Sequence, residues 1–201
     1  MSNILITDIL PLDNKRRKVY INGKYAFPLY LSELKKYHIQ PNESLDDLKW
    51  NTITGLIHRR IRERILYLLE AMPRTEYNIR KKLADNHYSE AYINPVIEEL
   101  KSFGYIDDRA YALNFAQSMS ANRGMSRKVI IQKLYEKGVN REYIYEAIDT
   151  LPVDETELIN KALKKKGLSM DEVRELPPKE KQKIYRYLVG KGFSSFSINM
   201  Y

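Results

Sequence analysis

The chain has 201 residues, of which 34 are Lys or Arg and 26 are Asp or Glu, so its formal net charge is +8. It contains no cysteine, which excludes disulfide bonds, thiol catalysis and thiolate-bound metals. A mean hydropathy of −0.53, with no apolar run near the roughly 18 residues of a membrane span, predicts a soluble, cytoplasmic protein.

The first thirty residues favour a small antiparallel sheet. Residues 4–10 are rich in Ile and Leu, and two further β-prone runs, 19–21 and 25–27, flank the dipeptide Asn22-Gly23. Asn-Gly tolerates positive φ at both central positions of a hairpin turn. Because a lone hairpin is marginally stable in water, we expect it to pair with the strand at 4–10 or to pack on a helix.

The pattern then becomes helical. Two short helices are expected at 32–38 and 44–49, with Ser32 and Ser44 as their N-caps. A longer helix is expected over 51–71, because its Ile and Leu residues recur at helical spacing.

The rest of the chain repeats itself. Residues 78–83 match residues 129–134 at an offset of 51 positions, and residues 137–140 match 191–194 at an offset of 54. Periods of this length indicate stacked supersecondary units. The three units are predicted to contain helices at 51–71, 75–85 and 89–102, then 108–121, 126–137 and 140–150, then 154–166, 178–190 and 194 onward.

Helix ends recur at equivalent places in the three units. Ser89, Asn140 and Ser194 stand at matching N-cap positions. Gly138 and Gly192 are placed to end helices in the left-handed conformation, and His87 occupies the same place in the first unit. Ser169 to Glu172 is typical of a capping box and predicts a short inserted helix.

The expected fold class is mainly α. It is a tandem array of three three-helix repeats, elongated and curved, preceded by a small N-terminal β-hairpin or sheet element. The domains expected are an N-terminal β element with short helices at 1–50, and repeats at 51–106, 107–152 and 153–201.

Catalytic motifs are not evident. The eight glycines form no phosphate-binding loop, and none of the three histidines has a metal-ligand partner at helical spacing. Asp107-Asp108 could indicate a metal nuclease, but capping of the helix that follows is the favoured interpretation. We therefore predict no enzymatic activity, no cofactor and no metal.

Basic residues are the main functional signal. Their recurrence on the second helix of successive units favours a surface that meets phosphates or an acidic protein face. For each residue taken singly, a solvated helix face is the favoured interpretation. The candidate contact residues are Arg59, Arg62, Lys82, Arg123, Arg127, Lys128, Lys133, Lys137, Lys164 and Lys183. The residues assigned to the core are Tyr105, Ile106, Tyr111, Leu134 and Leu188.

Three segments carry a resemblance to a known family: Phe103-Gly104-Tyr105-Ile106-Asp107-Asp108, Tyr111-Ala112, and Leu134-Tyr135-Glu136-Lys137-Gly138-Val139. In this order and spacing they resemble the RecX family, bacterial regulators of the RecA recombinase, over roughly residues 60–195. The hairpin with Tyr25-Ala26-Phe27 resembles the longer N-terminus of Gram-positive members. The family usually has a glycine at the start of the second helix of unit two, where this chain has Ser126 and places Gly124 two residues earlier.

The resemblance implies a non-enzymatic, mainly negative modulator that binds the groove of the RecA–DNA filament and restrains ATP hydrolysis and strand exchange. It implies the RecA filament as partner, single- or double-stranded DNA as a further partner, no membrane, and a monomer. The alternative is a helical DNA-binding protein or transcription regulator acting on DNA directly, because three-helix units resemble helix-turn-helix modules.

Overall fold

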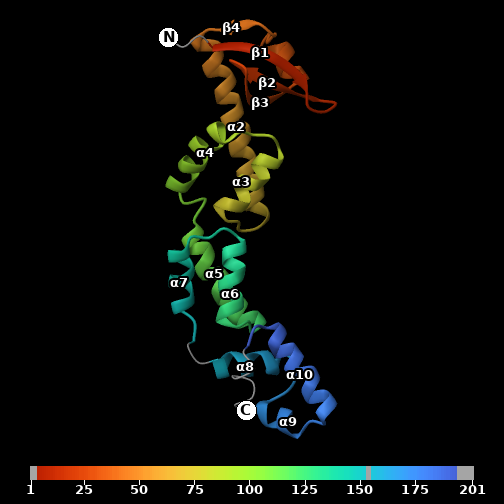
Figure 1. The fold of residues 1–201 in the computed structure, drawn as a ribbon. Coiled ribbons are helices and arrows are strands. Elements are labelled where there is room, and N and C mark those ends of the chain that lie inside the picture. Colours follow the sequence, from red (N-terminus) through yellow and green to blue (C-terminus); the bar gives the residue numbers. More distant parts are fainter. Residues whose placement is uncertain (1–3, 153–154, 194–201) are drawn as a thin grey trace. The chain divides into compact units, whose positions relative to one another are not determined.

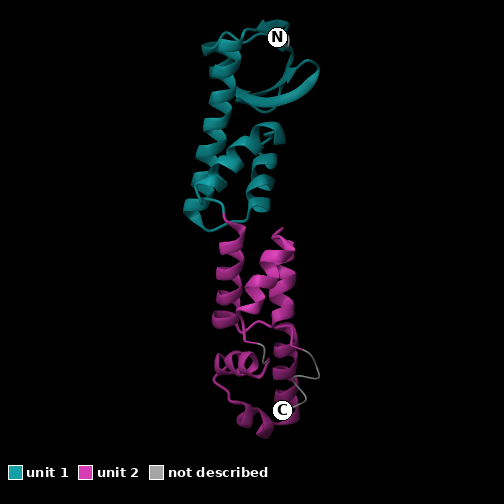
Figure 2. Cartoon of the chain, turned by 90° about the vertical axis from the view of Figure 1, so that its left-hand side faces the viewer, with its two compact units in different colours: residues 1–106 teal, residues 107–201 magenta. Residues whose placement is uncertain are grey.

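The computed structural model describes residues 4–152 and 155–193, and the chain divides into two compact units, 1–106 and 107–201 (Figure 2). Helices dominate and a small sheet lies at the N-terminus, so the mainly α prediction is confirmed (Figure 1). The elements of unit 1 are β1 (Ile4–Pro11), β2 (Arg16–Ile21), β3 (Lys24–Tyr30), α1 (Leu31–Lys36), β4 (Glu43–Leu45), α2 (Asp47–Ala71), α3 (Glu76–Asp85) and α4 (Glu90–Ser102). Those of unit 2 are α5 (Asp108–Arg123), α6 (Arg127–Glu136), α7 (Arg141–Asp149), α8 (Glu155–Lys164), α9 (Met170–Glu175) and α10 (Pro178–Gly190).

The N-terminal strands form an antiparallel sheet in the order β3-β2-β1-β4. The predicted hairpin is confirmed, since Asn22 and Gly23 have φ of 48° and 78° between β2 and β3. The Asn22 side chain also accepts a hydrogen bond from the Leu5 N–H at 3.0 Å. The turn is therefore fixed to β1, which pairs with the hairpin as expected.

The first of the two predicted short helices exists, but Ser32 does not cap it. Helix α1 begins at Leu31, with Tyr30 as its N-cap residue. The Tyr30 N–H donates to the Glu33 carboxylate at 2.7 Å. A glutamate in the first turn thus provides an acceptor at this helix end, and Ser32 lies inside the helix.

The second predicted short helix, 44–49, is wrong. Residues 43–45 form β4, which pairs with the start of β1. The Asp46 carboxylate then accepts a hydrogen bond from the Lys49 N–H at 2.6 Å, so the long helix α2 begins at Asp47. Ser44 has the chemistry of a cap, but its backbone pairs with β1, and tertiary pairing overrides the local signal.

One continuous apolar core joins the sheet to helices α2, α3 and α4 of unit 1. Phe27 of β3 is 1% exposed and its ring contacts Trp50 of α2 and Tyr92 of α4, with centroid distances of 6.3 and 5.1 Å. Ile57 and Ile61 of α2 are fully buried in the same core. In Figure 1, helix α2 extends away from the sheet, and helices α3 and α4 pack along α2. The core therefore extends across the domain boundary expected at residue 50.

The outer edge of β3 is covered by side chains of the first repeat. The Ala26 carbonyl accepts a hydrogen bond from the Ser89 hydroxyl at 2.8 Å, and the Pro28 carbonyl accepts one from the Arg60 guanidinium at 3.2 Å. Pro28 itself has no N–H to leave unpaired. Ser89 is the N-cap residue of α4 as predicted, but its hydroxyl bonds to β3 rather than to the helix. Two carbonyls of the edge strand are thus occupied by side chains of the first repeat.

The turn between β1 and β2 gives a prediction for pH dependence. The Asp13 carboxylate accepts hydrogen bonds from the N–H groups of Lys15 and Arg16 at 2.9 and 2.8 Å, and pairs with the Arg16 guanidinium at 2.7 Å. The bond from Lys15, followed by the Arg16 guanidinium, lowers the pKa of Asp13 to about 2. A lowered carboxyl pKa stabilises the fold above the ordinary value of 3.8, and this contribution is lost as the pH falls toward 2.

We expect a carbon-13 NMR titration of the Asp13 carboxyl to give a midpoint near 2. Arg16→Gln keeps both backbone donors, so the midpoint is expected to rise only part of the way to the ordinary value. An ordinary midpoint in the parent protein would contradict the hydrogen bonding described for this turn.

The second repeat consists of α5, α6 and α7, which pack on one another in unit 2 around a core that includes Leu134 and Ile144. The Asp107 carboxylate accepts a hydrogen bond from the Ala110 N–H at 2.8 Å and caps α5, which confirms the capping interpretation. Asn140 caps α7 in the same way.

The third repeat contributes α8 and α10, whose core includes Leu158, Leu188 and Phe193. The inserted helix α9 is confirmed with its capping box, in which Ser169 and Glu172 exchange hydrogen bonds of 2.6 and 3.2 Å. The helix predicted from residue 194, with Ser194 as its N-cap, lies outside the described residues.

The equivalent helix ends are confirmed by the backbone. Gly138 and Gly192 have φ of 74° and 88°, and His87 takes φ of 68° at the matching place in the first repeat. Gly124 has φ of 53° and ends α5, which leaves Ser126 free to cap α6. The departure from the expected glycine position therefore separates the end of one helix from the start of the next.

The core assignment is right for Ile106, Leu134 and Leu188, which are nearly fully buried, and Tyr111 is half-buried. It is wrong for Tyr105, which is 58% exposed. The Tyr105 N–H closes the turn after α4 by donating to the Leu100 carbonyl at 2.9 Å, and only the next residue, Ile106, enters the core.

Candidate functional site

The arginines of α2 divide into structural and exposed groups. Arg60 pairs with Glu33, and its guanidinium lies 4.9 Å from the centre of the Tyr30 ring, so it belongs to the joint between the sheet and α2. Arg62 pairs with Glu99 of α4 at 2.5 Å, which offsets its charge. Arg59 is exposed, and within the described part of the chain no carboxylate pairs with it. Of the two α2 candidates, Arg59 is the better placed to meet a partner.

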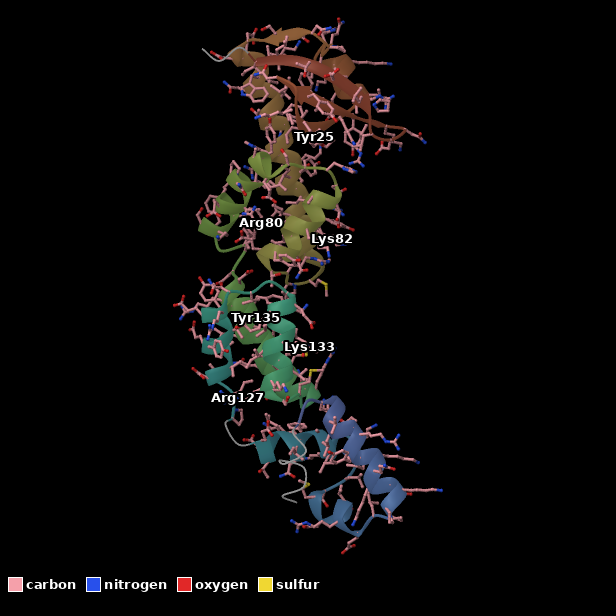
Figure 3. The ribbon with its side chains drawn as sticks, viewed as in Figure 1. Tyr25, Arg80, Lys82, Arg127, Lys133 and Tyr135 are labelled. Carbon is pink, nitrogen blue, oxygen red and sulfur yellow. The ribbon has the colours of Figure 1, made fainter. Side chains whose placement is uncertain are left out.

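Helix α3 separates its basic residues in the same way. Arg80 pairs with Glu76 at 2.7 Å and with Glu90 at 2.6 Å, and so holds α3 against α4. Lys82 is exposed, and Figure 3 shows it on the side of α3 opposite Arg80. Lys82 therefore remains available on the surface of unit 1, whereas the Arg80 guanidinium is engaged in ion pairs within the fold.

The candidates on α6 do not share one side of the helix. Lys128 is exposed, while Arg127 is directed to the end of α7, where it donates to the Leu151 carbonyl at 3.3 Å and pairs with Asp149 at 3.5 Å. Figure 3 shows Lys133 on the opposite side of α6 from Tyr135. Lys133 and Lys137 are four residues apart and thus lie on one side.

Lys137 also takes part in packing. Its ammonium lies 5.3 Å from the centre of the Phe115 ring and 5.9 Å from that of Tyr111, and these two rings stack on each other in α5. A cation above an aromatic face is attracted by the ring quadrupole. Lys137 therefore couples the end of α6 to α5, which gives it a structural role beside any contact with a partner.

The remaining candidates lie on three helices of unit 2, two of them in a last turn. Arg123 is exposed in the last turn of α5, Lys164 is exposed in the last turn of α8, and Lys183 is exposed on α10. Three of the ten candidates, Arg62, Arg127 and Lys137, thus have partners within the fold, and the exposed cations are spread over all three repeats.

Sequence reasoning missed one group of cations as a set, because its members come from three separate segments. Arg123 ends α5, Lys165 and Lys166 follow α8, and Lys191 follows α10. The Lys191 ammonium donates to the Arg123 carbonyl at 2.6 Å. We call Arg123, Lys165, Lys166 and Lys191 the tetracationic cluster.

Tyr187 of α10 lies within this cluster. Its ring centre is 4.9 Å from the Lys166 ammonium and 5.5 Å from that of Lys191. Partial burial, followed by the charges of Lys165, Arg123 and Lys166, lowers the pKa of Lys191. The cluster is therefore a place where positive charges are held together against their mutual repulsion.

The described residues hold no group of three His, Asp or Glu side chains that could bind a metal ion, and none of their helices is long and apolar enough to cross a membrane. Their exposed surface carries many cations and several tyrosines. Among the latter, Tyr135 and Tyr145 lie on adjacent helices, and the Arg141 guanidinium is 5.4 Å from the Tyr145 ring centre.

Comparison with known families assigns the three repeats. The models of the first, second and third three-helix domains of RecX match residues 62–100, 107–148 and 154–201. This chain belongs to the RecX family. The three RecX models match the chain in the same order as its three internal repeats. The first match begins at residue 62, inside α2.

Individual RecX proteins match nearly the whole chain. A protein named regulatory protein RecX from Limosilactobacillus reuteri is 31% identical over 90% of this chain and 68% of its own length. A protein of the same name from Clostridium beijerinckii is 26% identical over 97% of this chain and 92% of its own. A crystal structure of regulatory protein RecX has a TM-score of 0.59 at 29% identity, covering 98% of both chains. The RecX structure from Lactobacillus salivarius, at 24% identity and a TM-score of 0.59 over 73% of this chain and 94% of that chain, shows the shared fold.

Proposed function

We propose that this chain is a non-enzymatic modulator, mainly a negative regulator, of the RecA recombinase. It would bind in the groove of the RecA–DNA filament and restrain ATP hydrolysis and strand exchange. The observation that carries the proposal is the match of three consecutive RecX domains, together with relatives named regulatory proteins. The proposal needs no cofactor.

Exposed cations in each repeat support a partner that is long and negatively charged. Arg59 and Lys82 provide them in the first repeat, Lys128 in the second, and Lys164 and Lys183 in the third. A filament presents acidic side chains and DNA phosphate at regular intervals, so contacts of modest strength can add along it. A modulator that spans several protomers would favour whichever filament state it binds better, and a state that hydrolyses ATP slowly would then accumulate.

The direct experiment is a titration into RecA assembled on single-stranded DNA, with ATP hydrolysis as the readout. We expect the rate to fall and to reach a plateau at saturation. A rate that does not change at saturating protein would contradict the proposal. Binding to bare DNA and to RecA-coated DNA at physiological salt tests the alternative, because a direct DNA regulator would not prefer the coated form.

Charge reversal tests whether the exposed candidates form the contact. The triple variant Arg59→Glu, Lys82→Glu, Lys128→Glu removes exposed cations from two repeats, and we expect filament binding to weaken at least tenfold while helicity is kept. Lys24→Glu, Lys35→Glu, Lys36→Glu is the matched control, with the same change in net charge at exposed positions near the sheet. If both triple variants lose binding equally, net charge alone is responsible and the candidates are not the contact surface.

A further inference from the structure

The arginine at the start of α7 has no role in the packing of unit 2. Arg141 is exposed, and no carboxylate in the described part of the chain pairs with it. Farther along α7, Glu146 pairs with Arg109 of α5. Asp149 pairs with Arg127 of α6. Because a cation in the first turn of a helix opposes the helix dipole, the stability of α7 does not explain an arginine at this position.

Two exposed tyrosines form a compact patch with Arg141. Its guanidinium lies 5.4 Å from the centre of the Tyr145 ring, one helical turn along α7. The hydroxyl of Tyr135, near the end of α6, is hydrogen-bonded to the hydroxyl of Tyr145. Desolvation, followed by this hydrogen bond, raises the pKa of Tyr135, so its hydroxyl stays protonated at neutral pH. We call Tyr135, Arg141 and Tyr145 the two-tyrosine surface.

The turn between α6 and α7 fixes the two-tyrosine surface. Gly138 has φ of 74°, and the Val139 N–H closes the turn by donating to the Leu134 carbonyl at 3.1 Å. Leu134, Val139 and Ile144 are buried in the core of the second repeat. The rings are therefore positioned before a partner arrives, and binding has less side-chain freedom to remove. Tyr and Arg are also the residue types that are enriched among the hot spots of protein interfaces.

The charges near this surface favour a protein partner over a nucleic acid. Glu136 follows Tyr135 and Glu142 follows Arg141, and both carboxylates are exposed. The phosphates of a polyanion would meet these carboxylates while contacting a single cation. A protein can instead place one carboxylate on Arg141 and apolar atoms on the two rings. A guanidinium that lies over an aromatic ring still presents the planar fork that binds both oxygens of a carboxylate.

We propose that the two-tyrosine surface docks a protein partner, with Arg141 binding the carboxylate of an Asp or Glu residue of that partner and the two tyrosines covering the apolar atoms around it. The inference rests on the proposed function for the identity of the partner, the RecA protomers of the filament. The surface would thus contact protein and not DNA. Its three residues are not among the ten candidate contact residues, and Lys133, which is, lies on the opposite side of α6 from Tyr135 (Figure 3).

Cosedimentation of the full chain with RecA filaments on single-stranded DNA measures this contact. Arg141→Gln is expected to weaken binding about tenfold or more, as the loss of an interface hot spot does. It should not lower the urea midpoint, because Arg141 makes no ion pair within the described residues and opposes the dipole of α7. Arg141→Lys keeps the charge but loses the planar fork, so it is expected to weaken binding nearly as much.

A second pair of variants tests the tyrosines. Tyr145→Ala is expected to weaken filament binding. Tyr67→Ala is its matched control, since Tyr67 of α2 is also exposed and has the Arg64 guanidinium 5.3 Å from its ring centre. This control is expected to bind the filament like the parent. Circular dichroism checks that each variant is folded, and Arg141→Gln carries the test alone if Tyr145→Ala is not.

Several results would overturn the inference. Binding like that of the parent in both Arg141→Gln and Tyr145→Ala would show that the surface makes no contact. Full binding by Arg141→Lys would show that a point charge is enough. Equal loss of binding to bare single-stranded DNA would assign the surface to nucleic acid, and a parent dimer that Arg141→Gln dissociates in sedimentation velocity would assign it to a second copy of this chain. All four leave the proposed function standing, because that function is tested by the parent's own binding and its effect on ATP hydrolysis. A parent chain that does not sediment with the filament would overturn both.

Discussion

Removal of residues 1–45 is expected to unfold the first three-helix repeat. Phe27 is buried against Trp50 and Tyr92, and Ile57 and Ile61 share its core. Loss of a buried Phe side chain alone costs about 3–5 kcal/mol, and small domains have only about 5–15 kcal/mol of stability in total. Truncation removes Phe27 together with Leu29, Val19 and Ile6, all almost fully buried. The loss therefore exceeds what the repeat can tolerate.

Amide hydrogen exchange read by mass spectrometry would measure this. In the chain that starts at Asp46, peptides from α3 and α4 are expected to exchange as fast as unfolded chain, while peptides from α5 to α7 in unit 2 keep their protection. The point variant Phe27→Ala is the graded control and is expected to destabilise unit 1 by about 3–5 kcal/mol without unfolding it. Full protection of α3 and α4 in the truncated chain would show that the domain boundary expected at residue 50 is real.

Replacement of Gly192 by alanine is expected to destabilise unit 2 strongly. Its φ of +88° is unfavourable for any side chain, at about 1–3 kcal/mol. A Cβ at this position would also overlap Val129 Cγ2 and lie 2.5 Å from Ser126 Oγ. Ser126 is fully buried and caps α6, so it cannot move without loss of the cap. Overpacking of this kind adds about 1–3 kcal/mol, for a total of roughly 2–6 kcal/mol.

Gly167→Ala is the matched control for this prediction. Gly167 lies in the same unit with φ of +71°, but nothing lies within 4 Å of its would-be Cβ. The Gly167→Ala variant should lose only the stability that positive φ costs a residue with a Cβ. Its urea midpoint is therefore expected to fall much less than that of Gly192→Ala. Equal midpoints would mean that close packing against Ser126 and Val129 is not what requires glycine. His87 supports the distinction, since a bulky residue is found at φ of 68° in the equivalent turn of the first repeat.

The repeats could be predicted from the sequence because local signals and tertiary structure agree there. Ile79 and Leu83 in α3 and Ile130 and Leu134 in α6 recur at helical spacing, and all four are buried. Asp107 caps a helix whether or not the rest of the fold is known. Ser44 failed for the opposite reason, since strand pairing with β1 decided its conformation, and no local pattern indicates that partner.

The candidate surface was harder to predict than the fold. A run of arginines in α2 gives no sign that Arg60 meets Glu33 and Arg62 meets Glu99, because both partners lie more than twenty residues away in sequence. The tetracationic cluster escaped for the same reason, since Arg123 and Lys191 are separated by 68 positions. Tyr105 was placed in the core by its apolar ring, whereas the turn that begins at Gly104 directs it outward. The charge of a side chain can be read from the sequence, but the residue with which it pairs lies far away in the sequence.

The covering of β3 by the first repeat has a consequence during translation. The Ala26 carbonyl meets its partner Ser89 only after 63 further residues have been added. At about 5–20 residues per second this takes roughly 3–13 s. During that interval the edge strand β3 of the nascent chain is uncovered. Such an edge can pair with a strand of another nascent chain on the same polysome. A ribosome-bound chaperone that covers this edge would therefore protect the nascent chain until Ser89 has been added.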